Sequence, residues 1–276
     1  MEVEANNVQE EPDSCWVDTS KDSFQWRLAA ASICGKSHEK TGQLCQDAHY
    51  WSTLPGGILV AAVADGAGSA ALGKVGAIVA AETAVETICS NQMALQSPED
   101  EKGWQLLLTD ALVAARAAVE AEAEACNAAI RDLSTTLIVT IATPKLVAAA
   151  QIGDGVAVLG DQQGNLIALT TPQRGEYANE TTFLVSPQAL DTAQVTLWRG
   201  AAANIAVLSD GLQMLALEMH EGTPHAPFFS PLFHFLAGVP NEAEAKEQIV
   251  ALLRSERIAK LTDDDLTLLL ATLVVV

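Results

Sequence analysis

Aspartates stand at the ends of several apolar, strand-like runs, and they are the residues of this chain best suited to chemistry. Asp65 follows LVAAVA, Asp154 follows VAAAQIG, Asp210 follows IAVLS, and the triplet at 263–265 precedes LTLLL. A carboxylate beside an apolar strand costs free energy unless it is paired. If these strand ends meet at one rim, the carboxylates repel one another, and bound cations would compensate for their charge. Oxygen ligands without histidine or cysteine favour magnesium or manganese over zinc.

A simpler interpretation treats each aspartate as part of a turn. Boundaries between strands and loops are polar in most proteins, and a single Asp-Gly pair is most often only a turn. This chain has three such pairs, at 65–66, 154–155 and 210–211, each directly after a predicted strand. Their repetition favours a shared site over three unrelated turns.

The glycine-rich turn after Asp65 also matches parts of two nucleotide-binding templates. The phosphate loop is matched as far as Lys74, but Val75 has no hydroxyl that could ligate magnesium. The segment 66–71 fits the dinucleotide fingerprint, but the polar stretch 90–103 follows where that fold needs a second strand. We therefore take Asp65 as the functional group and the glycines as the means of exposing it.

The composition limits the partners and the location of the protein. The 276 residues include 35 acidic and 15 basic side chains, and the net charge of -20 repels phosphate backbones and anionic lipid surfaces. We therefore expect neither a nucleic-acid nor a membrane partner. Five cysteines without a C-x-x-C pair suit a reducing cytosol, which predicts a cytoplasmic protein. We expect an acidic, disordered tail over residues 1–24 and a single, monomeric domain over 25–276.

Short apolar runs rich in β-branched residues predict the strands that would position these aspartates. Several runs are apolar on nearly every residue, so both faces of their sheet should be covered. The turns at 143–145 and 161–165 predict antiparallel hairpins. The predicted strands are 27–34, 57–65, 135–143, 145–154, 156–161, 165–171, 193–200, 204–210 and 266–276.

Helical patterns at 70–90, 104–132 and 241–260 separate groups of these strands. The combination predicts an α/β domain with sheet packed on sheet and helices outside.

Six short motifs follow one another between residue 35 and the C-terminus: CQDAHYW, VADGAGSA, STTLIV, QIGDGVAVL, VLSDGL and DDDLTLLL. This ordered set resembles the type-2C, metal-dependent protein serine/threonine phosphatases. The stretches GKSHEKTGQLCQDA and GEYANETTFL resemble a bacterial branch of that family. The resemblance implies an α-β-β-α sandwich of two mainly antiparallel sheets, with a two-metal site at one end.

The resemblance also implies roles for individual residues. Asp65 would bridge two Mg²⁺ or Mn²⁺ ions, and Gly66 would lend its carbonyl oxygen to one of them. Asp210 and Asp264 would complete the other ion, and Asp154 would help to hold a third, weaker one. We choose Asp264 within its triplet because the family pattern places the ligand three residues before a threonine.

The implied reaction is hydrolysis of a phosphoserine or phosphothreonine ester. The two ions would lower the pKa of a bridging water, and the resulting hydroxide would attack phosphorus in line. Asp47 would act as a catalytic residue through metal-bound water. A phosphorylated protein is then the implied substrate, and a protein kinase is an implied partner.

The chain departs from the family pattern at three places. Gln46 stands where the family usually has an acid, so one ion would be held more weakly or through water. Ala67 stands where many relatives carry a histidine thought to assist the leaving group. The usual phosphate-binding arginine is missing, and the segment offers Lys36, His38 and Lys40 instead. We predict that Lys40 binds substrate and that His38 is catalytic, in either of the two lost roles.

The segment 170–194, between two predicted strands, should form a flap near the site. Long loops on rigid scaffolds tend to carry specificity, so Asn179, Glu180 and Thr181 are predicted to bind substrate. The same residues could instead cap a short helix.

Two functions remain open at this point. Retention of Asp65, Asp210 and Asp264 favours a working phosphatase, because a general acid supplies only about 10²–10⁴-fold whereas the metals are essential. Gln46 and Ala67 favour the alternative, a weak or inactive pseudophosphatase that regulates by binding metal or phosphoprotein.

Overall fold

The computed structural model describes residues 24–91, 95, 101–173, 181–218 and 220–275. Within these residues the strands form two five-stranded sheets and a short two-stranded ribbon, and every strand pairing is antiparallel. The first sheet has the order β1 (Phe24–Ile33), β12 (Leu266–Val275), β9 (Ala202–Leu208), β6 (Val156–Asp161) and β7 (Leu166–Ala168). The second has the order β2 (Asp47–Leu54), β3 (Ile58–Asp65), β4 (Leu137–Ala142), β5 (Leu146–Ile152) and β8 (Gln194–Arg199). The ribbon consists of β10 (Leu217–Glu218) and β11 (Thr223–Pro224).

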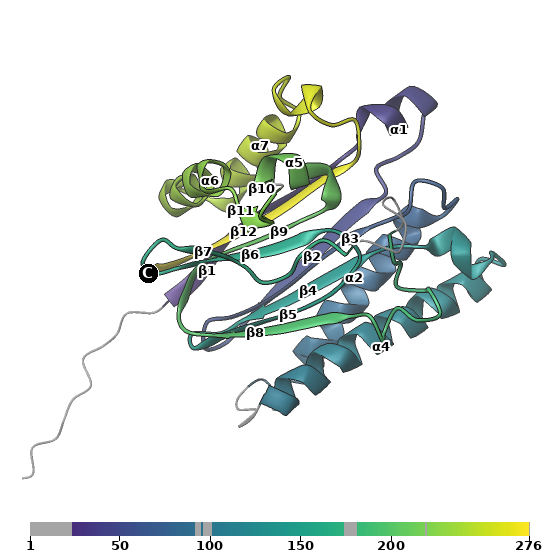
Figure 1. Cartoon of the computed structure of the whole chain (residues 1–276), viewed down its shortest axis with the longest axis horizontal. Helices are drawn as coiled ribbons and strands as arrows, with labels where there is room; N and C mark the ends of the chain where they lie inside the picture. Colours follow the sequence, from purple (N-terminus) through teal and green to yellow (C-terminus); the bar gives the residue numbers. More distant parts are fainter. Residues whose placement is uncertain (1–23, 92–94, 96–100, 174–180, 219, 276) are drawn as a thin grey trace, which may run out of the picture.

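The two sheets lie face to face between two layers of helices (Figure 1). The described helices are α1 (Lys36–Thr41), α2 (Gly73–Ser90), α4 (Glu101–Ala125), α5 (Gln213–Ala216), α6 (Ala226–Gly238) and α7 (Glu242–Leu253). Helices α2 and α4 cover the second sheet, and α6 and α7 cover the first. The predicted α-β-β-α sandwich of antiparallel sheets is therefore confirmed.

Three apolar cores hold the four layers together. One lies between the second sheet and α2 and α4, one between the first sheet and α6 and α7, and one between the two sheets. Strands β4 and β5 are buried along their whole length, because each has a helix layer on one face and the other sheet on the opposite face. This is the reason that their sequences are apolar at nearly every position.

Both predicted hairpins are present. β4 pairs with β5 across the turn at 143–145, and the Thr143 hydroxyl oxygen accepts hydrogen bonds from the backbone of Lys145 and Leu146. β6 pairs with β7 across 161–165, where the Asp161 carboxylate accepts hydrogen bonds from the backbone of Gln163 and Asn165.

Two of the longer elements, and the short α1, α5, β10 and β11, were not predicted from the sequence. Two helices end earlier than expected, and one of them, α7, ends at Leu253 rather than at residue 260. β2 was missed because most of its residues are only half buried, so polar and aromatic side chains interrupt the apolar pattern. α6 was missed because two prolines and four phenylalanines disguise its helical pattern. α4 ends at Ala125 rather than near residue 132, because Asn127 takes a positive φ of 51° and the chain turns into η1 (Ile130–Leu133).

Strand register brings the aspartate-bearing ends together. In the second sheet, Asp47 at the start of β2 pairs directly with Asp65 at the end of β3. The end of β5, two residues before Asp154, pairs with the start of β4. In the first sheet, the end of β9, two residues before Asp210, pairs with Leu268 of β12 and with the start of β6. We call this end of the sandwich the aspartate rim, defined by Asp47, Asp65, Asp154, Asp210 and Asp264.

The proposed division of the chain at residues 24 and 25 stays a prediction. Residues 1–23 lie outside the described part, and β1 begins at Phe24. In the part of the chain that the structure describes, no helix is long and apolar enough to cross a membrane.

Candidate metal centre

The centre of the aspartate rim is a cross-strand pair of carboxylates. Asp47 and Asp65 face each other in the β2–β3 ladder, and their carboxyl groups are within hydrogen-bonding distance. Like charges directly opposite each other destabilise a sheet unless a proton or a cation intervenes. Asp210, which follows β9 of the other sheet, also contacts the Asp65 carboxyl group. Asp65 therefore stands between one carboxylate of its own sheet and one of the facing sheet.

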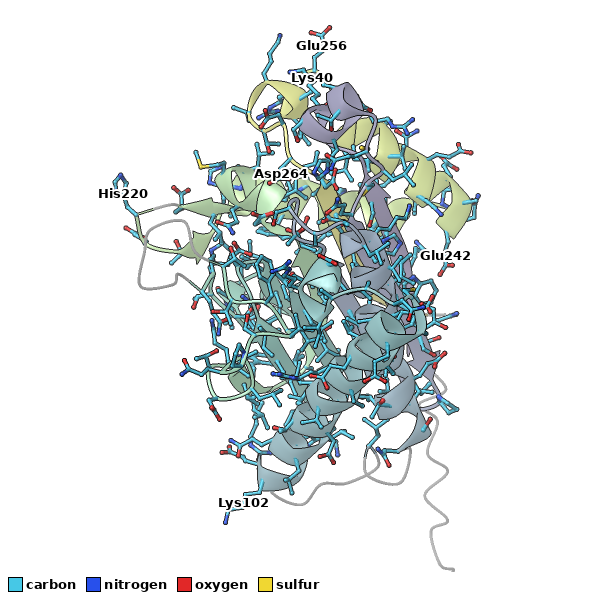
Figure 2. All side chains as sticks on the ribbon, turned by 90° about the vertical axis from the view of Figure 1, so that its right-hand side faces the viewer. Lys40, Lys102, His220, Glu242, Glu256 and Asp264 are labelled. Carbon is cyan, nitrogen blue, oxygen red and sulfur yellow. The ribbon has the colours of Figure 1, made fainter. Side chains whose placement is uncertain are left out.

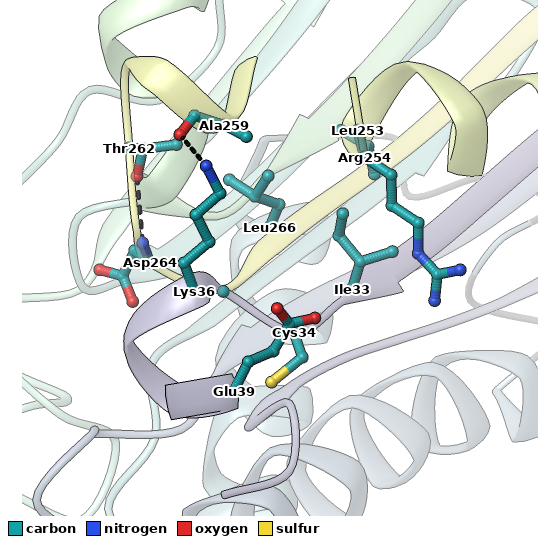
Figure 3. A pocket seen from close by; sticks show the side chains of 11 residues that line it. Ile33, Cys34, Lys36, Glu39, Leu253, Arg254, Ala259, Thr262, Asp264 and Leu266 are labelled. Atoms are coloured by element: carbon teal, nitrogen blue, oxygen red, sulfur yellow. Dashed lines mark hydrogen bonds between the residues drawn. The ribbon is translucent and has the colours of Figure 1, made fainter. Parts of the chain in front are cut away.

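Two further aspartates surround this group. The charges of Asp154 and Asp264 both act on Asp210. These residues are far apart in the sequence but lie near one another, as their positions next to strand ends predicted. Asp264 is exposed and borders a pocket of about 260 Å³ that Lys36 and Arg254 also line (Figure 3). The rim is thus open to solvent on the side of α1 and α7.

Burial and mutual repulsion raise the pKa of the central carboxyl groups. Burial raises the pKa of Asp47 to about 7, against hydrogen bonds from Ser209 and Thr267 that lower it. Burial, followed by the charges of Asp47 and Asp210, raises the pKa of Asp65 well above its ordinary value. Burial raises the pKa of Asp210 to about 6. A cation bound nearby would favour the ionised form of each group, and the proton would pass to solvent.

Unsatisfied oxygens at the rim fit a hard divalent ion. Oδ1 of Asp47 and Oδ1 of Asp210 are buried and have no hydrogen-bond partner, which is costly for a carboxylate. Within the described residues, no three His, Cys, Asp or Glu side chains are already spaced as a complete ligand set. The central aspartates contact one another directly, so they would have to separate to admit an ion. The donors are all oxygens, which Mg²⁺ and Mn²⁺ prefer.

The loop that follows Asp65 is held by residues that the sequence analysis did not single out. The Thr135 hydroxyl donates to the Asp65 carbonyl oxygen at 3.0 Å, and the Asp65 amide donates to the Thr136 hydroxyl at 3.0 Å. A methyl group on Gly66 would lie 2.4 Å from the carbonyl carbon of Gly73, so only glycine lets the loop fold back onto the start of α2. The STT motif before β4 was the available signal, because hydroxyl residues next to a buried strand must bond to something.

A buried polar chain fixes Asp47 and links the two sheets. The Ser209 hydroxyl donates to Asp47 Oδ2 at 2.7 Å, and the Thr267 amide donates to the Ser209 oxygen at 2.9 Å. The Thr267 hydroxyl donates to Ser32 Oγ at 2.6 Å, and Ser32 Oγ lies 2.8 Å from Nδ1 of His49. One carboxylate oxygen of Asp47 is therefore fixed, and the other is left for the site.

Gln46 binds the loop at residues 65–68, which we call the metal loop, through its side-chain amide group. The outer end of its side chain faces two carbonyl oxygens, so the amide nitrogen must point toward them. In this orientation the nitrogen donates to the carbonyl oxygens of Gly66 at 3.1 Å and Ala67 at 2.7 Å. A carboxylate at this position could not make these bonds. The predicted role of Gln46 as a weak or water-mediated ligand stays a prediction.

Asp265, and not only Asp264, has a defined place at the rim. Its carboxylate is 2% exposed and accepts hydrogen bonds from the backbone N–H of Gly35 at 2.7 Å and the backbone N–H of Gln46 at 2.6 Å. Its Oδ2 also lies 3.0 Å from Nδ1 of His38. The sequence offered three adjacent aspartates without showing which of them turns inward.

The predicted substrate-binding residues have different positions. The Thr181 hydroxyl donates to Asp154 Oδ2 at 2.6 Å, which ties the 170–194 segment to the rim. Asn179 and Glu180 lie outside the described residues. Lys40 is exposed on α1, and Figure 2 shows it at one tip of the molecule, farther out than Asp264. All four substrate-binding assignments stay predictions.

Two antiparallel sheets between helical layers, with an all-oxygen carboxylate cluster at one rim, define the class of metal-dependent phosphatases built on an α-β-β-α sandwich. Comparisons with known proteins agree. A family model described as protein phosphatase 2C matches residues 34–254. Serine/threonine-protein phosphatase 3 of Escherichia coli (strain K12) is 36% identical over 258 residues, which is 90% of this chain and 98% of the relative. The chain therefore belongs to the protein phosphatase 2C family, and it is a metal-dependent protein serine/threonine phosphatase.

Solved structures share the fold at low sequence identity. The serine/threonine phosphatase Stp1 from Staphylococcus aureus superposes with a TM-score of 0.59 at 13% identity, covering 89% of this chain and 94% of its own. PppA from Pseudomonas aeruginosa, described as a regulatory component of a type VI secretion system, gives 0.59 at 17% identity, with 92% and 99% covered. The catalytic domain of the phosphatase PstP, solved with two manganese ions, gives 0.53 at 19% identity, with 91% and 100% covered.

Proposed function

We propose that the aspartate rim holds two divalent cations, Mn²⁺ or Mg²⁺, through Asp65, the carbonyl oxygen of Gly66, Asp210 and Asp264. Asp154 is available for a third ion. The observation that carries this proposal is the convergence of carboxylates from both sheets, with a buried oxygen of Asp210 that lacks any partner. The two manganese ions in the PstP structure support manganese as one of the ions.

Asp47 orients the attacking water in this proposal. Bound divalent ions supply Lewis-acid chemistry, which neutralises phosphoryl charge and makes water a better nucleophile. Ser209 holds Oδ2 of Asp47, so Oδ1 keeps a fixed direction and can accept a hydrogen bond from a water molecule. The buried chain through Thr267 limits rotation of Ser209 and so of Asp47.

Gln46 positions the carbonyl oxygen of Gly66. A carbonyl oxygen has two lone pairs, so the Gly66 oxygen can accept the Gln46 amide hydrogen and still face a cation. Gln46 thereby places a neutral side-chain amide where the family usually has a negatively charged carboxylate. We expect weaker ion binding at this rim than a carboxylate at position 46 would give.

The substrate is a phosphoserine or phosphothreonine protein. Thr181, Asn179 and Glu180 would contact it from the 170–194 segment, and Lys40 would contact it from α1. A protein kinase that supplies the phosphoprotein, a role in signalling, a cytoplasmic location and a monomeric state complete the proposal. They are supported by the acidic composition, the five cysteines without a C-x-x-C pair and the enzyme class.

The proposal is tested by phosphate release from p-nitrophenyl phosphate and from a phosphothreonine peptide, with Mn²⁺, with Mg²⁺ or with EDTA. We expect turnover that requires the metal and that Asp210→Ala removes. Asp110→Ala is the matched control, because Asp110 is an exposed aspartate on α4, outside the rim and the 170–194 segment. Calorimetry should show Mn²⁺ binding to the wild type and weaker binding to Asp210→Ala.

Two results would contradict the proposal. Equal turnover by Asp210→Ala and the wild type would show that the rim is not the metal site. Mn²⁺ binding by the wild type without turnover on either ester would instead support a pseudophosphatase regulator.

A further inference from the structure

His38 is a buried histidine on a short surface helix beside the aspartate rim. The side chain is only 11% exposed, although α1 has six residues and its neighbours Glu39 and Lys40 are exposed. Nδ1 is buried and makes no well-aligned hydrogen bond. It lies 3.0 Å from Oδ2 of Asp265, so a modest rotation of the ring would complete that bond.

The Asp265 carboxylate joins three segments at this point. It accepts the amide of Gly35 just before α1 and the amide of Gln46 just before β2, and it faces the ring of His38. A methyl group on Gly35 would lie 2.2 Å from the backbone of Asp264, so α1 packs tightly against the aspartate triplet. The position of His38 relative to the rim is therefore set by a buried, multiply bonded carboxylate rather than by a mobile loop.

The opposite ring nitrogen of His38 faces the metal loop. A methyl group added to Gly68 would lie 3.4 Å from Nε2 of His38, so Nε2 approaches the loop three residues after Asp65. Gly68 is exposed, whereas the ring of His38 is buried. The charge of His38 also acts on Asp264, the chain neighbour of Asp265. Nε2 therefore faces the loop that follows Asp65, while Nδ1 faces Asp265.

We propose that His38 is the general acid of this phosphatase and that Asp265 is its positioning residue. The inference rests on the proposed function, and it assigns His38 one of the two roles left open by the sequence. Asp265 holds Nδ1–H of the protonated ring, so that Nε2–H points toward the seryl or threonyl oxygen of the bound ester. This arrangement follows the general logic of a carboxylate that orients a catalytic imidazole.

The proposed step balances as follows. The oxygen of water forms a bond to phosphorus, and the bond between phosphorus and the seryl oxygen breaks with its electron pair on that oxygen. Nε2 of His38 donates its proton to the seryl oxygen, which leaves as a neutral hydroxyl. The neutral imidazole then takes up one proton from solvent, which matches the proton lost by the attacking water. The products are the dephosphorylated side chain and inorganic phosphate.

The leaving group provides a test of this step. An alkoxide from serine is a poor leaving group and needs a proton, whereas p-nitrophenolate is stable without one. Replacing His38 should therefore slow hydrolysis of a phosphoserine peptide by about 10²–10⁴-fold in kcat and change p-nitrophenyl phosphate hydrolysis by less than about threefold. A purely structural role for His38 would lower both activities together.

Two substitutions separate proton donation from packing and hydrogen bonding. His38→Asn keeps an amide donor near the position of Nδ1, and His38→Gln keeps one near the position of Nε2, but neither can transfer a proton. We expect both to show the selective loss on phosphoserine with an unchanged Mn²⁺ isotherm and melting temperature. His220→Asn is the control, because Figure 2 shows His220 pointing away from the body of the molecule, far from the Asp264 side of the rim. Equal kcat values for the His38 variants and the wild type on the peptide would overturn the proposal.

The role of Asp265 is tested without turnover. In ¹⁵N spectra of metal-free protein, we expect His38 to carry a fixed hydrogen on Nδ1 in the wild type and a mixture of tautomers in Asp265→Asn. That variant should also lose about tenfold in kcat on phosphoserine, because the ring of His38 would no longer be held in one orientation, with KM and p-nitrophenyl phosphate activity nearly unchanged. An unchanged tautomer pattern in Asp265→Asn would refute the positioning role.

The outcomes keep the two proposals apart. If the wild type hydrolyses neither ester with Mn²⁺, the proposed function is wrong and the general-acid role falls with it. If the wild type hydrolyses both esters and Asp210→Ala neither, while the His38 variants match the wild type, only the further inference is wrong.

Discussion

The centre of the aspartate rim and the interface between α2, α4 and the second sheet are both buried, but they are built on opposite principles. At the rim, Asp47, Asp65 and Asp210 lie close together, although burial and repulsion oppose their charges. At the helix interface, the buried residues are almost all apolar, and many are alanines that allow close approach. Stability therefore comes from the helix interface, while the rim holds opposed charges whose repulsion bound cations would relieve.

Alanine explains how the helix interface stays so tight. The buried face of α2 includes Ala77, Ala80, Ala81 and Ala84, and Gly76 admits the backbone of Leu133. These small side chains let α2 lie close over β2 and β3, while α4 supplies the larger leucines that fill the remaining space. Close packing there makes even small volume changes costly.

Asp65→Asn should separate activity from stability more clearly than any other substitution at the rim. We expect the loss of metal-dependent turnover to exceed about 10³-fold, since more than one transition-state interaction disappears. The metal-free variant should melt at the same temperature as the wild type or higher, because one of the opposed buried charges has gone. Turnover and thermal melting in EDTA measure the two effects. A large drop in melting temperature would show that the rim stabilises the fold.

The helix interface should give the reverse pattern in Leu108→Ala. Leu108 on α4 is fully buried, so its truncation should lower the free energy of unfolding by about 2–5 kcal/mol. At a temperature where the variant is still folded, kcat should change less than about twofold, because no site residue is displaced. Urea unfolding and steady-state kinetics on one preparation test this expectation. A fall in kcat comparable to that of Asp65→Asn would mean that the two regions are not separate.

The metal-free rim should also give the stability a characteristic pH dependence. The pKa of Asp47 is raised from 3.8 to about 7 in the folded protein, so the native state holds the proton more tightly than the unfolded chain. Stability should therefore be highest below pH 4 on this account and decline as the pH rises toward 7. We expect Asp47→Asn to flatten this decline and saturating Mn²⁺ to offset it. Melting curves from pH 4 to 8 in EDTA measure it, and a wild-type profile that matches Asp47→Asn would contradict it.

His49 should contribute a smaller pH effect of the opposite sign. Burial, and then the charge of Lys246, lowers its pKa from 6.5 to about 4. The unfolded chain therefore binds a proton that the native state refuses, and stability should be lost as the pH falls from about 6.5 toward 4. We expect on the order of 2 kcal/mol, seen as the difference between wild type and His49→Gln in urea unfolding. Parallel profiles for the two proteins would rule out this contribution.

Much of this protein could be predicted from the sequence, because apolar runs and turn residues act locally. Short-range patterns of burial and turn chemistry predict most of the strands and both hairpins. They also place Asp65, Asp154 and Asp210 at the ends of strands. β2 and α6 could not be predicted in this way, because half-burial and aromatic or proline residues obscure their periodicity.

Which carboxyl groups lie together at the rim depends on the tertiary structure. The Asp47–Asp65 pair depends on strand register, and the contact of Asp65 with Asp210 depends on how one sheet packs on the other. In the same way, only the packing of α1 turns Asp265 inward toward His38 and leaves Asp264 exposed. Adjacent aspartates are chemically identical in a sequence. Burial and long-range partners, which depend on residues far along the chain, give each one its separate role.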